Sequence, residues 1–246
     1  MKDNQLLYIA GSGRSGSTLL DMLLSRHTSI AALGEVHRLY MNLRVDTDAH
    51  KCTCGVRVCD CQFWRAVDCS LREMNPNAYE RGILDLVTTD PKHVNIPDDI
   101  TGLNIEEAVS SNYYRVKLSH MLLLLGSRRL FNLAAVPFSS LQLINKIAHD
   151  SHLLYDAVRK STGKPIVVDS TKTPLRLKSL YMLRPKEFKV INLVRDGRAV
   201  AFARTGRQGI GMSNAAKIWR SEQNKLKAVL LTIPKSKILR VHYESL

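Results

Sequence analysis

The sequence has no long apolar run. The longest clear one, Met121–Leu125, is far shorter than the roughly 18–20 residues that cross a bilayer. The first residues, MKDNQ, lead straight into an apolar stretch without the cleavage pattern of a signal peptide. Internal repeats and low-complexity segments are also missing. We therefore expect a protein without a membrane span, located in the cytoplasm.

The sequence also lacks a long block of lysine and arginine, although it is strongly basic. Basic residues outnumber acidic ones by 36 to 22, giving a net charge of +14. Such a charge favours an anionic partner, which could be a nucleic acid, a membrane surface or a phosphorylated small molecule. Because the basic residues are scattered along the chain, a nucleic acid is the least favoured of these partners. A merely basic surface is the simplest alternative.

Cysteine is absent outside one short segment. The five cysteines lie within eighteen residues, at Cys52, Cys54, Cys59, Cys61 and Cys69. This clustering excludes the disulfide framework of a small secreted protein. The first four cysteines could bind zinc, but C-x-C spacing is atypical of structural zinc sites, and free thiols are the default in a reducing cytosol. We predict no required metal, and expect Phe63 and Trp64 to pack this segment against the body.

Short apolar segments alternate with helical patterns. Strands are predicted at 5–10, 30–33, 165–169, 188–194 and 238–242. Helices are predicted at 16–26, 174–183 and 214–231, with another starting at 197 and a mostly helical region from about 105 to 162. Residues 88–102 read as a loop. This alternation predicts an α/β fold, a three-layer α/β/α arrangement with a central parallel sheet like that of P-loop NTPases.

A glycine-rich turn joins the first predicted strand and helix in LLYIAGSGRSGSTLL. Gly11, Gly16 and Thr18 match the phosphate-binding pattern G-x-x-x-x-G-K-[ST], but Ser17 replaces the lysine. Backbone N–H groups and the helix N-terminus can still bind an anion there. Arg14 offers a guanidinium fork, and Ser15, Ser17 and Thr18 offer hydroxyl groups. Without the lysine, chemistry on a Mg²⁺-bound triphosphate is disfavoured.

A second basic segment, INLVRDGRAVAFARTGR, follows the predicted strand 188–194. Arg195 comes directly after this strand, where ligands bind in parallel sheets. This position suits an anion site, whereas Arg198 fits a solvated helix face. The sequence does not indicate the direction of Arg204.

GRSGSTLL and LVRDGRAV together resemble the sulfotransferases that use 3′-phosphoadenylyl sulfate (PAPS), above all the protein-tyrosine sulfotransferases and their bacterial relatives. LGEVHR, DSTKTP, Trp219 and VHYESL match further landmarks in the same order. The resemblance implies a P-loop-like fold and metal-free transfer of a sulfuryl group from PAPS to a hydroxyl, or amine, of an acceptor of unknown class.

The resemblance also implies roles for individual residues. The donor's 5′-phosphosulfate would be held by Arg14, Ser15, Gly16, Ser17 and Thr18, and its 3′-phosphate side by Arg195, Arg207 and Tyr243. Glu35 would be the general base, with His37 as a rival, and Lys172 would assist the leaving group. Arg14 would also stabilise charge on the transferred group.

The sequence departs from this family in two places. Ala203 stands where the family has a serine that contacts the 3′-phosphate. The chain stops at Leu246, where the family usually continues, so we expect that C-terminal part to be absent. We predict one domain over 1–246, with a Cys-rich insertion at 51–69 and a helical, acceptor-side region at about 104–162. Candidate lining residues there, which could equally be core, are Tyr113, Tyr114, His120 and Phe138.

Two alternatives remain open. The chain could be a Mg²⁺-dependent P-loop kinase or NTPase, with Asp169 after PIVV as the metal-binding carboxylate. It could also be a zinc-bearing nucleic-acid-binding protein that uses the cysteines and the positive charge. Neither alternative accounts for Arg195 and Glu35 together.

Overall fold

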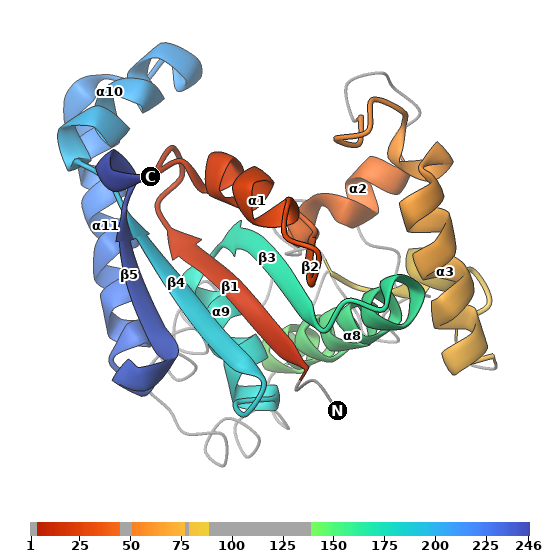
Figure 1. Ribbon diagram of the computed structural model, residues 1–246. Helices are drawn as coiled ribbons and strands as arrows, with labels where there is room; N and C mark the ends of the chain where they lie inside the picture. Colours follow the sequence, from red (N-terminus) through yellow and green to blue (C-terminus); the bar gives the residue numbers. More distant parts are fainter. Residues whose placement is uncertain (1–3, 45–50, 77–78, 89–138) are drawn as a thin grey trace.

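A five-stranded parallel sheet forms the centre of the molecule (Figure 1). The computed structural model describes residues 4–44, 51–76, 79–88 and 139–246. The strand order is β2-β3-β1-β4-β5, and every pairing is parallel. The strands are β1 Gln5–Gly11, β2 Ile30–Ala32, β3 Ile166–Lys172, β4 Phe188–Val194 and β5 Ile238–His242. The predicted α/β class is confirmed, and all carboxyl ends of the strands meet at one edge.

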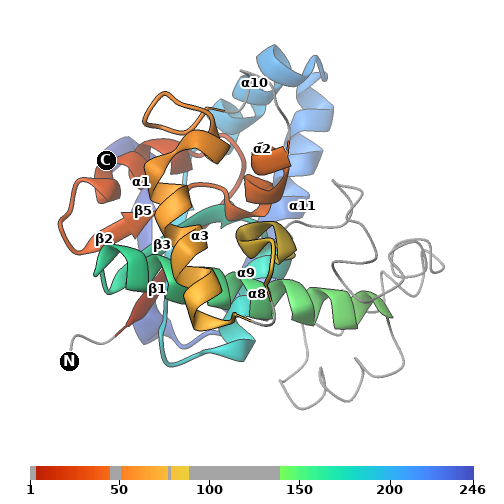
Figure 2. The ribbon, with the colours of Figure 1, turned by 90° about the vertical axis from the view of Figure 1, so that its right-hand side faces the viewer.

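Helices pack on both faces of this sheet. The helices are α1 Ser17–Ser25, α2 Leu39–Arg44, α3 Gln62–Met74, α8 Ser139–Thr162, α9 Pro174–Leu183, α10 Gly197–Gln208 and α11 Met212–Leu230. Helices α8, α9 and α11 contact the strands on one face, and α1 contacts them on the other. Figure 2 shows α3 lying across α8, outside the sheet layer. Single 3₁₀ turns are η1 Val36–Arg38, η2 Val58–Asp60, η3 Gly82–Asp85, η5 Lys235–Lys237 and η6 Tyr243–Ser245.

Strand β1 supplies apolar side chains to both faces. Leu6 and Tyr8 belong to the larger core, on the side of α8, α9 and α11. Ile9 belongs to the smaller core under α1, with Leu20 and Val168. This alternation follows from the two-residue repeat of a strand. Because both of its faces are covered, β1 is held rigidly where the glycine-rich loop begins.

Strand β3 is longer than its apolar segment predicts. The prediction ended the strand at Asp169, but β3 continues to Lys172. Tyr8 pairs with Asp169 and Ala10 pairs with Lys172, so β3 has one extra residue opposite β1. Backbone N–H of Ser170 also donates to the Gly34 carbonyl at 2.9 Å. The polar tail of β3 is therefore held on both sides and places Lys172 at the sheet edge.

The Cys-rich insertion contains the start of a helix, α3, that was not predicted from the sequence. Helix α3 starts inside the predicted 51–69 segment and continues to Met74. Trp64, Val67 and Leu71 are buried at helical spacing and pack in the larger core. The expected packing of Trp64 is confirmed, and Phe63 lies partly buried beside it.

Helix α8 confirms the last part of the predicted helical region. The rest of that region, with Tyr113, Tyr114, His120 and Phe138, lies outside the described residues, as does most of the predicted loop at 88–102. Among the helices that the structure describes, none combines the length and apolarity that crossing a bilayer would need.

Candidate active site

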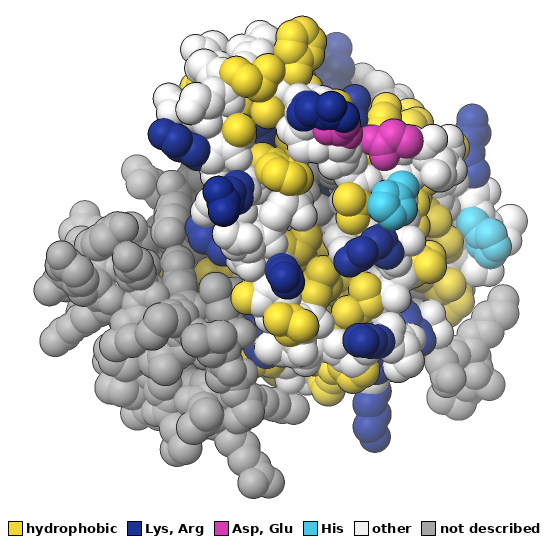
Figure 3. Space-filling model, turned by 90° about the vertical axis from the view of Figure 1, so that its left-hand side faces the viewer, with side chains coloured by type: hydrophobic (Ala, Val, Ile, Leu, Met, Phe, Trp, Pro, Cys, Tyr) yellow, Lys and Arg dark blue, Asp and Glu magenta, His cyan; other side chains and the backbone are white. Residues whose placement is uncertain are grey.

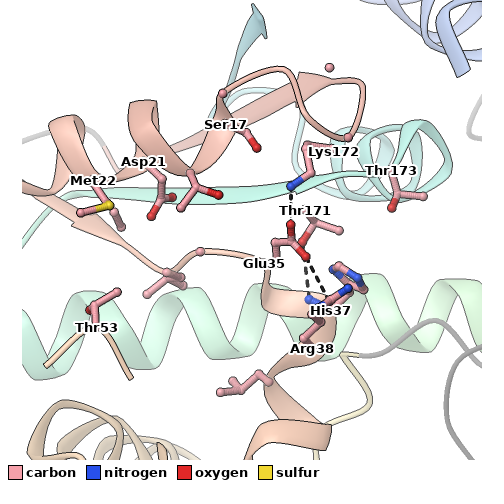
Figure 4. Close-up of a pocket in the computed structure, with 18 of the residues that line it drawn as sticks. Ser17, Asp21, Met22, Glu35, His37, Arg38, Thr53, Thr171, Lys172 and Thr173 are labelled. Atoms are coloured by element: carbon pink, nitrogen blue, oxygen red, sulfur yellow. Dashed lines mark hydrogen bonds and ion pairs between the residues drawn. The ribbon is translucent and has the colours of Figure 1, made fainter. Parts of the chain in front are cut away.

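A cleft of ≈ 1630 Å³ opens at the edge of the sheet where the strands end. Its walls include the loop after β1, Glu35 beyond β2, Lys172 at the end of β3, and part of α10. Figure 4 shows Ser17 and Asp21 from α1 on the same side as Lys172, with Glu35, His37 and Arg38 facing them. The topology therefore brings together the segments that the sequence separates.

The glycine-rich loop turns sharply into α1. Arg14 and Gly16 both have positive φ angles, of 71° and 91°. Gly16 occupies the N-cap position of α1, which leaves backbone N–H groups of the first turn without helical partners. The Ser15 hydroxyl is buried and has no hydrogen-bond partner within the described residues. The N–H groups at the start of α1 make the loop a suitable place for an anion, and Ser15 lies outside the cleft lining.

The aromatic ring of Tyr243 covers this loop. A Cβ atom at position 16 would overlap the Tyr243 ring, so only glycine fits there. The Arg195 guanidinium stacks on the same ring, with its Cζ 4.2 Å from the centroid, and its Nη1 donates to the Arg14 carbonyl at 2.9 Å. The structure thus brings together Arg14, Arg195 and Tyr243, which lie far apart in the sequence.

The arginines of α10 differ in their surroundings. Arg198 has a side chain 93% exposed and pairs with Asp196, the N-cap residue of the helix, which agrees with a solvated face. Arg207 is exposed and lines the cleft, as does Ala203. Arg204 is buried, donates to Glu222 at 2.6 Å and lies against Gly13. Arg204 therefore lies against the loop and also lines the cleft, a position that the sequence alone did not reveal.

Glu35 and Lys172 form an ion pair across the cleft. The Lys172 Nζ donates to Glu35 Oε1, and the Arg38 Nε lies 3.1 Å from Glu35 Oε2 (Figure 4). Burial by itself raises the pKa of Glu35, but attraction to Lys172 and Arg38 outweighs it, so the Glu35 pKa lies below its usual value. Glu35 is therefore an ionised carboxylate that can accept a proton.

His37, the rival base, lies beside this pair. Burial lowers the pKa of His37 to about 4, so the imidazole is neutral near pH 7. Its Nδ1 is buried without a hydrogen bond in the part of the chain that the structure describes. The usual argument for histidine, a pKa near neutrality, does not hold at this position. Near pH 7 both Glu35 and the neutral His37 can therefore accept a proton, and the ion pair with Lys172 is what distinguishes Glu35.

Another carboxyl group, Asp21, was not predicted for this cleft. Burial raises the pKa of Asp21 to about 6, and the Ser170 hydroxyl and the Gly34 backbone N–H offset only part of that rise. Asp21 lies one turn after Ser17 on α1 and lines the cleft. The i, i+4 spacing of Ser17 and Asp21 was the signal in the sequence that could have revealed it.

Asp169 lies away from the cleft, in the larger core. It is completely buried, and its Oδ2 accepts hydrogen bonds from the Tyr155 hydroxyl at 2.6 Å and the Arg176 Nε at 3.0 Å. Its Oδ1 accepts from the Thr171 backbone at 2.8 Å. With both oxygens occupied, Asp169 is not available as a Mg²⁺ ligand, which weighs against the kinase or NTPase alternative.

Three of the five cysteines meet at the far wall of the same cleft. The sulfur atoms of Cys52, Cys54 and Cys61 lie within 4.8 Å of one another. Cys59 and Cys69 are exposed and do not join this group. The sequence suggested a zinc site made of the first four cysteines. That ligand set is wrong, because Cys59 lies outside the group.

Basic side chains do not form one continuous patch on the face seen in Figure 3. The described Lys and Arg side chains there lie mostly apart, among apolar and uncharged groups. A nucleic-acid backbone is usually met by a contiguous basic stripe. This face does not favour the nucleic-acid alternative.

Comparisons with known proteins give structural matches only. No protein-family model matches the chain, and a search of curated proteins finds no match. Three solved chains do match. The sulfotransferase domain from the Synechococcus PCC 7002 olefin synthase has 18% identity and a TM-score of 0.48, covering 98% of this chain and 67% of that one. The sulfotransferase domain from the curacin biosynthetic pathway has 16% identity and a TM-score of 0.46, with 98% and 68% covered. Similarity at this level assigns no function to the chain.

Proposed function

We propose that the chain is a sulfotransferase that moves a sulfuryl group from 3′-phosphoadenylyl sulfate to a hydroxyl, or amine, of an acceptor. One observation carries the proposal: Glu35 and Lys172 form a carboxylate–ammonium pair in the cleft that the lysine-free loop also lines. A base, a proton donor and an anion-binding loop are the groups that such a transfer needs. The motif resemblance of the sequence supports the same reaction.

The donor's 5′-phosphosulfate is assigned to the loop. Gly16, Ser17 and Thr18 line the cleft and offer backbone N–H groups at the start of α1, whereas the buried Ser15 hydroxyl lies outside the cleft lining. Arg14 adds a charge-assisted contact. A sulfuryl group carries less charge than a γ-phosphate, which is consistent with a loop that has Ser17 in place of the lysine.

The 3′-phosphate is assigned to Arg195 and Arg207. Both arginines line the cleft beside the loop. Tyr243 fixes the Arg195 guanidinium through the stacking contact, so this cation is positioned before any ligand arrives. Arg204 lies against Gly13 and also lines the cleft, and we assign it a supporting role that partly replaces the serine missing at Ala203.

The transfer itself needs one proton acceptor and one proton donor. Glu35 takes the proton of the acceptor hydroxyl as its oxygen forms the new bond to sulfur. The bond from sulfur to the bridging oxygen breaks, and the electron pair leaves with adenosine 3′,5′-bisphosphate. Lys172 exchanges its contact with Glu35 for one with that bridging oxygen, while Arg14 stabilises charge on the transferred group. No metal ion takes part.

Titration calorimetry with adenosine 3′,5′-bisphosphate tests the donor site. We expect binding that is equal with and without added Mg²⁺. Arg195→Ala should weaken it by roughly tenfold to a hundredfold, the usual value of a charged hydrogen bond. Arg198→Ala is the matched control, because it removes the same charge from an exposed position three residues away and should bind normally.

Two results would overturn this assignment. The first is a folded wild-type protein that does not bind the bisphosphate. The second is binding of ATP that requires Mg²⁺ and exceeds binding of the bisphosphate, which would restore the kinase or NTPase alternative.

A further inference from the structure

Three thiols converge at one point on the wall of the cleft. Cys54 Sγ lies 3.5 Å from Cys61 Sγ, and Cys52 completes a group whose sulfurs all lie within 4.8 Å. The proposed sulfuryl transfer does not use any of these thiols. Cys61 is buried, Cys52 is half-buried and Cys54 is exposed. The group is therefore anchored in the protein and open to solvent on one side.

Two separate segments build this cluster. Cys52 and Cys54 lie in a small hairpin, closed by an antiparallel bridge between Lys51 and Arg57. Backbone N–H of Cys52 donates to the Val56 carbonyl at 2.8 Å, and the turn passes through Gly55, whose φ is 91°. The hairpin thus returns on itself directly after the second thiol.

Cys61 comes from the second segment, the start of helix α3. It is the N-cap residue of that helix, and its neighbours Val58 and Trp64 belong to the larger core. The position of Cys61 is therefore set by apolar packing before any ion arrives. Such preorganisation lowers the entropic cost of bringing ligands together.

We propose that Cys52, Cys54 and Cys61 bind a zinc ion as thiolates. Zinc–sulfur bonds of about 2.3 Å in tetrahedral geometry place the sulfurs about 3.8 Å apart, close to the spacing seen here. Zinc replaces the three thiol protons, and the charge of the site becomes −1. Among the described residues no fourth cysteine, histidine or carboxylate joins the group, so the fourth position takes water or another ligand.

A disulfide explains this arrangement less well. A Cys54–Cys61 bridge would need a sulfur–sulfur distance of about 2.05 Å and an oxidant, and would leave the third thiol without a role. A zinc ion uses all three sulfurs. It would fix the hairpin against α3, and since the hairpin lines the cleft that contains Glu35, the ion would stabilise one wall of the site.

Metal analysis of the full chain, purified with a reductant and zinc and then desalted, tests the site. We expect stoichiometric zinc in the wild type and loss of zinc in Cys54→Ser. This variant alters an exposed hairpin residue, so the core packing of Cys61 stays intact. Cys59→Ser and Cys69→Ser are matched controls that remove exposed thiols outside the cluster and should keep their zinc. Cobalt should give the charge-transfer absorption of thiolate ligands in the wild type and not in Cys54→Ser.

Thermal unfolding gives a second, independent measurement. A chelator should lower the melting temperature of the wild type and of Cys59→Ser, and leave that of Cys54→Ser unchanged. The proposal is overturned if the wild type holds no zinc and gives no cobalt absorption, or if Cys59→Ser loses as much zinc as Cys54→Ser. Peptide mapping that shows a Cys54–Cys61 disulfide in the reduced preparation would also overturn it.

Discussion

Strand β3 contributes to two charged clusters, one around Asp169 and one around Lys172, three residues further on. The two clusters differ in burial and in how far their hydrogen bonds are satisfied within the protein. Asp169 is fully buried and accepts hydrogen bonds from Tyr155, Arg176 and the backbone of Thr171. Lys172 faces the cleft and pairs with Glu35, whose side chain is 31% exposed. The first cluster has its hydrogen-bonding capacity filled from within the protein, and the second has capacity left for a ligand.

The backbone shows the same contrast. Asp169 sits in regular register opposite Tyr8, whereas Lys172 follows the register shift and has a φ of 72°, which is unusual for a residue with a side chain. Strained backbone is tolerated where the surrounding structure enforces it, and it often accompanies function. A saturated polar cluster therefore indicates stability, and an unsaturated, strained one indicates chemistry.

The largest expected effect is on the cluster in the cleft, which contains Glu35 and Lys172. Glu35→Gln keeps the shape of the side chain and removes the proton acceptor. We expect the turnover rate of sulfuryl transfer to fall by about 10²–10⁴-fold, measured as release of adenosine 3′,5′-bisphosphate. The midpoint of urea unfolding should change little. A variant with full turnover would show that Glu35 is not the base.

The next largest effect is on the buried cluster. Asp169→Asn leaves the Arg176 guanidinium without its buried counter-charge, so the free energy of unfolding should fall by about 3–5 kcal/mol in urea titrations. Asp60→Asn is the control, because Asp60 pairs with Arg57 and Arg65 at the surface, where such pairs contribute little. If the free energy of unfolding fell equally in the two variants, the buried cluster would contribute no more to stability than the surface pair, which would contradict the prediction.

The sequence predicted the sheet well, because buried parallel strands are short apolar runs that need no distant partner to be recognised. It also pointed to Arg14, Arg195 and Glu35, each of which directly follows or lies near a strand end. It could not give the direction of side chains on a helix. Arg204 and Arg207 both look available in the sequence, yet one is buried against the loop and the other is exposed.

Other features depend on contacts between distant segments. The extension of β3 to Lys172 needs β1 and Gly34, and the grouping of Cys61 with Cys52 and Cys54 needs the start of α3. Asp21 shares a helix face with Ser17, but its burial and its hydrogen bonds with Gly34 and Ser170 arise only in the folded chain. Spacing along the chain carries no information on such contacts.

A smaller effect is expected at Asp21. Its pKa is raised from 3.8 to about 6, so between these values the folded protein binds more protons than the unfolded chain. Stability therefore falls as the pH rises through this window. Asp21→Asn should remove that dependence and stabilise the protein at pH 7 by roughly 1–2 kcal/mol, after allowance for solvent screening. Unfolding titrations at several pH values would detect it, and an unchanged pH dependence would contradict it.

The smallest effect concerns how the turnover rate declines at low pH. Attraction to Lys172 and Arg38 holds the pKa of Glu35 below its usual value, so its carboxylate stays ionised and turnover should decline only at a pH below the ordinary titration range of a glutamate. A decline near pH 6 in the wild type, together with loss of turnover at all pH values in Asp21→Asn, would instead assign the proton acceptor to Asp21. Profiles of the wild type and this variant separate the two carboxyl groups.

The contact between Gly16 and Tyr243 has a consequence for synthesis of the chain. Strand β1 and its loop leave the ribosome early, but the strands that flank β1 begin only at Ile166 and Phe188, and the ring that covers the loop comes at Tyr243. During translation the loop is therefore synthesised long before the strands and the ring that hold it in its folded conformation. A nascent chain that has not reached Ile166 should be unable to hold an anion there, and the loop would take its folded shape only when β3 and β4 flank β1.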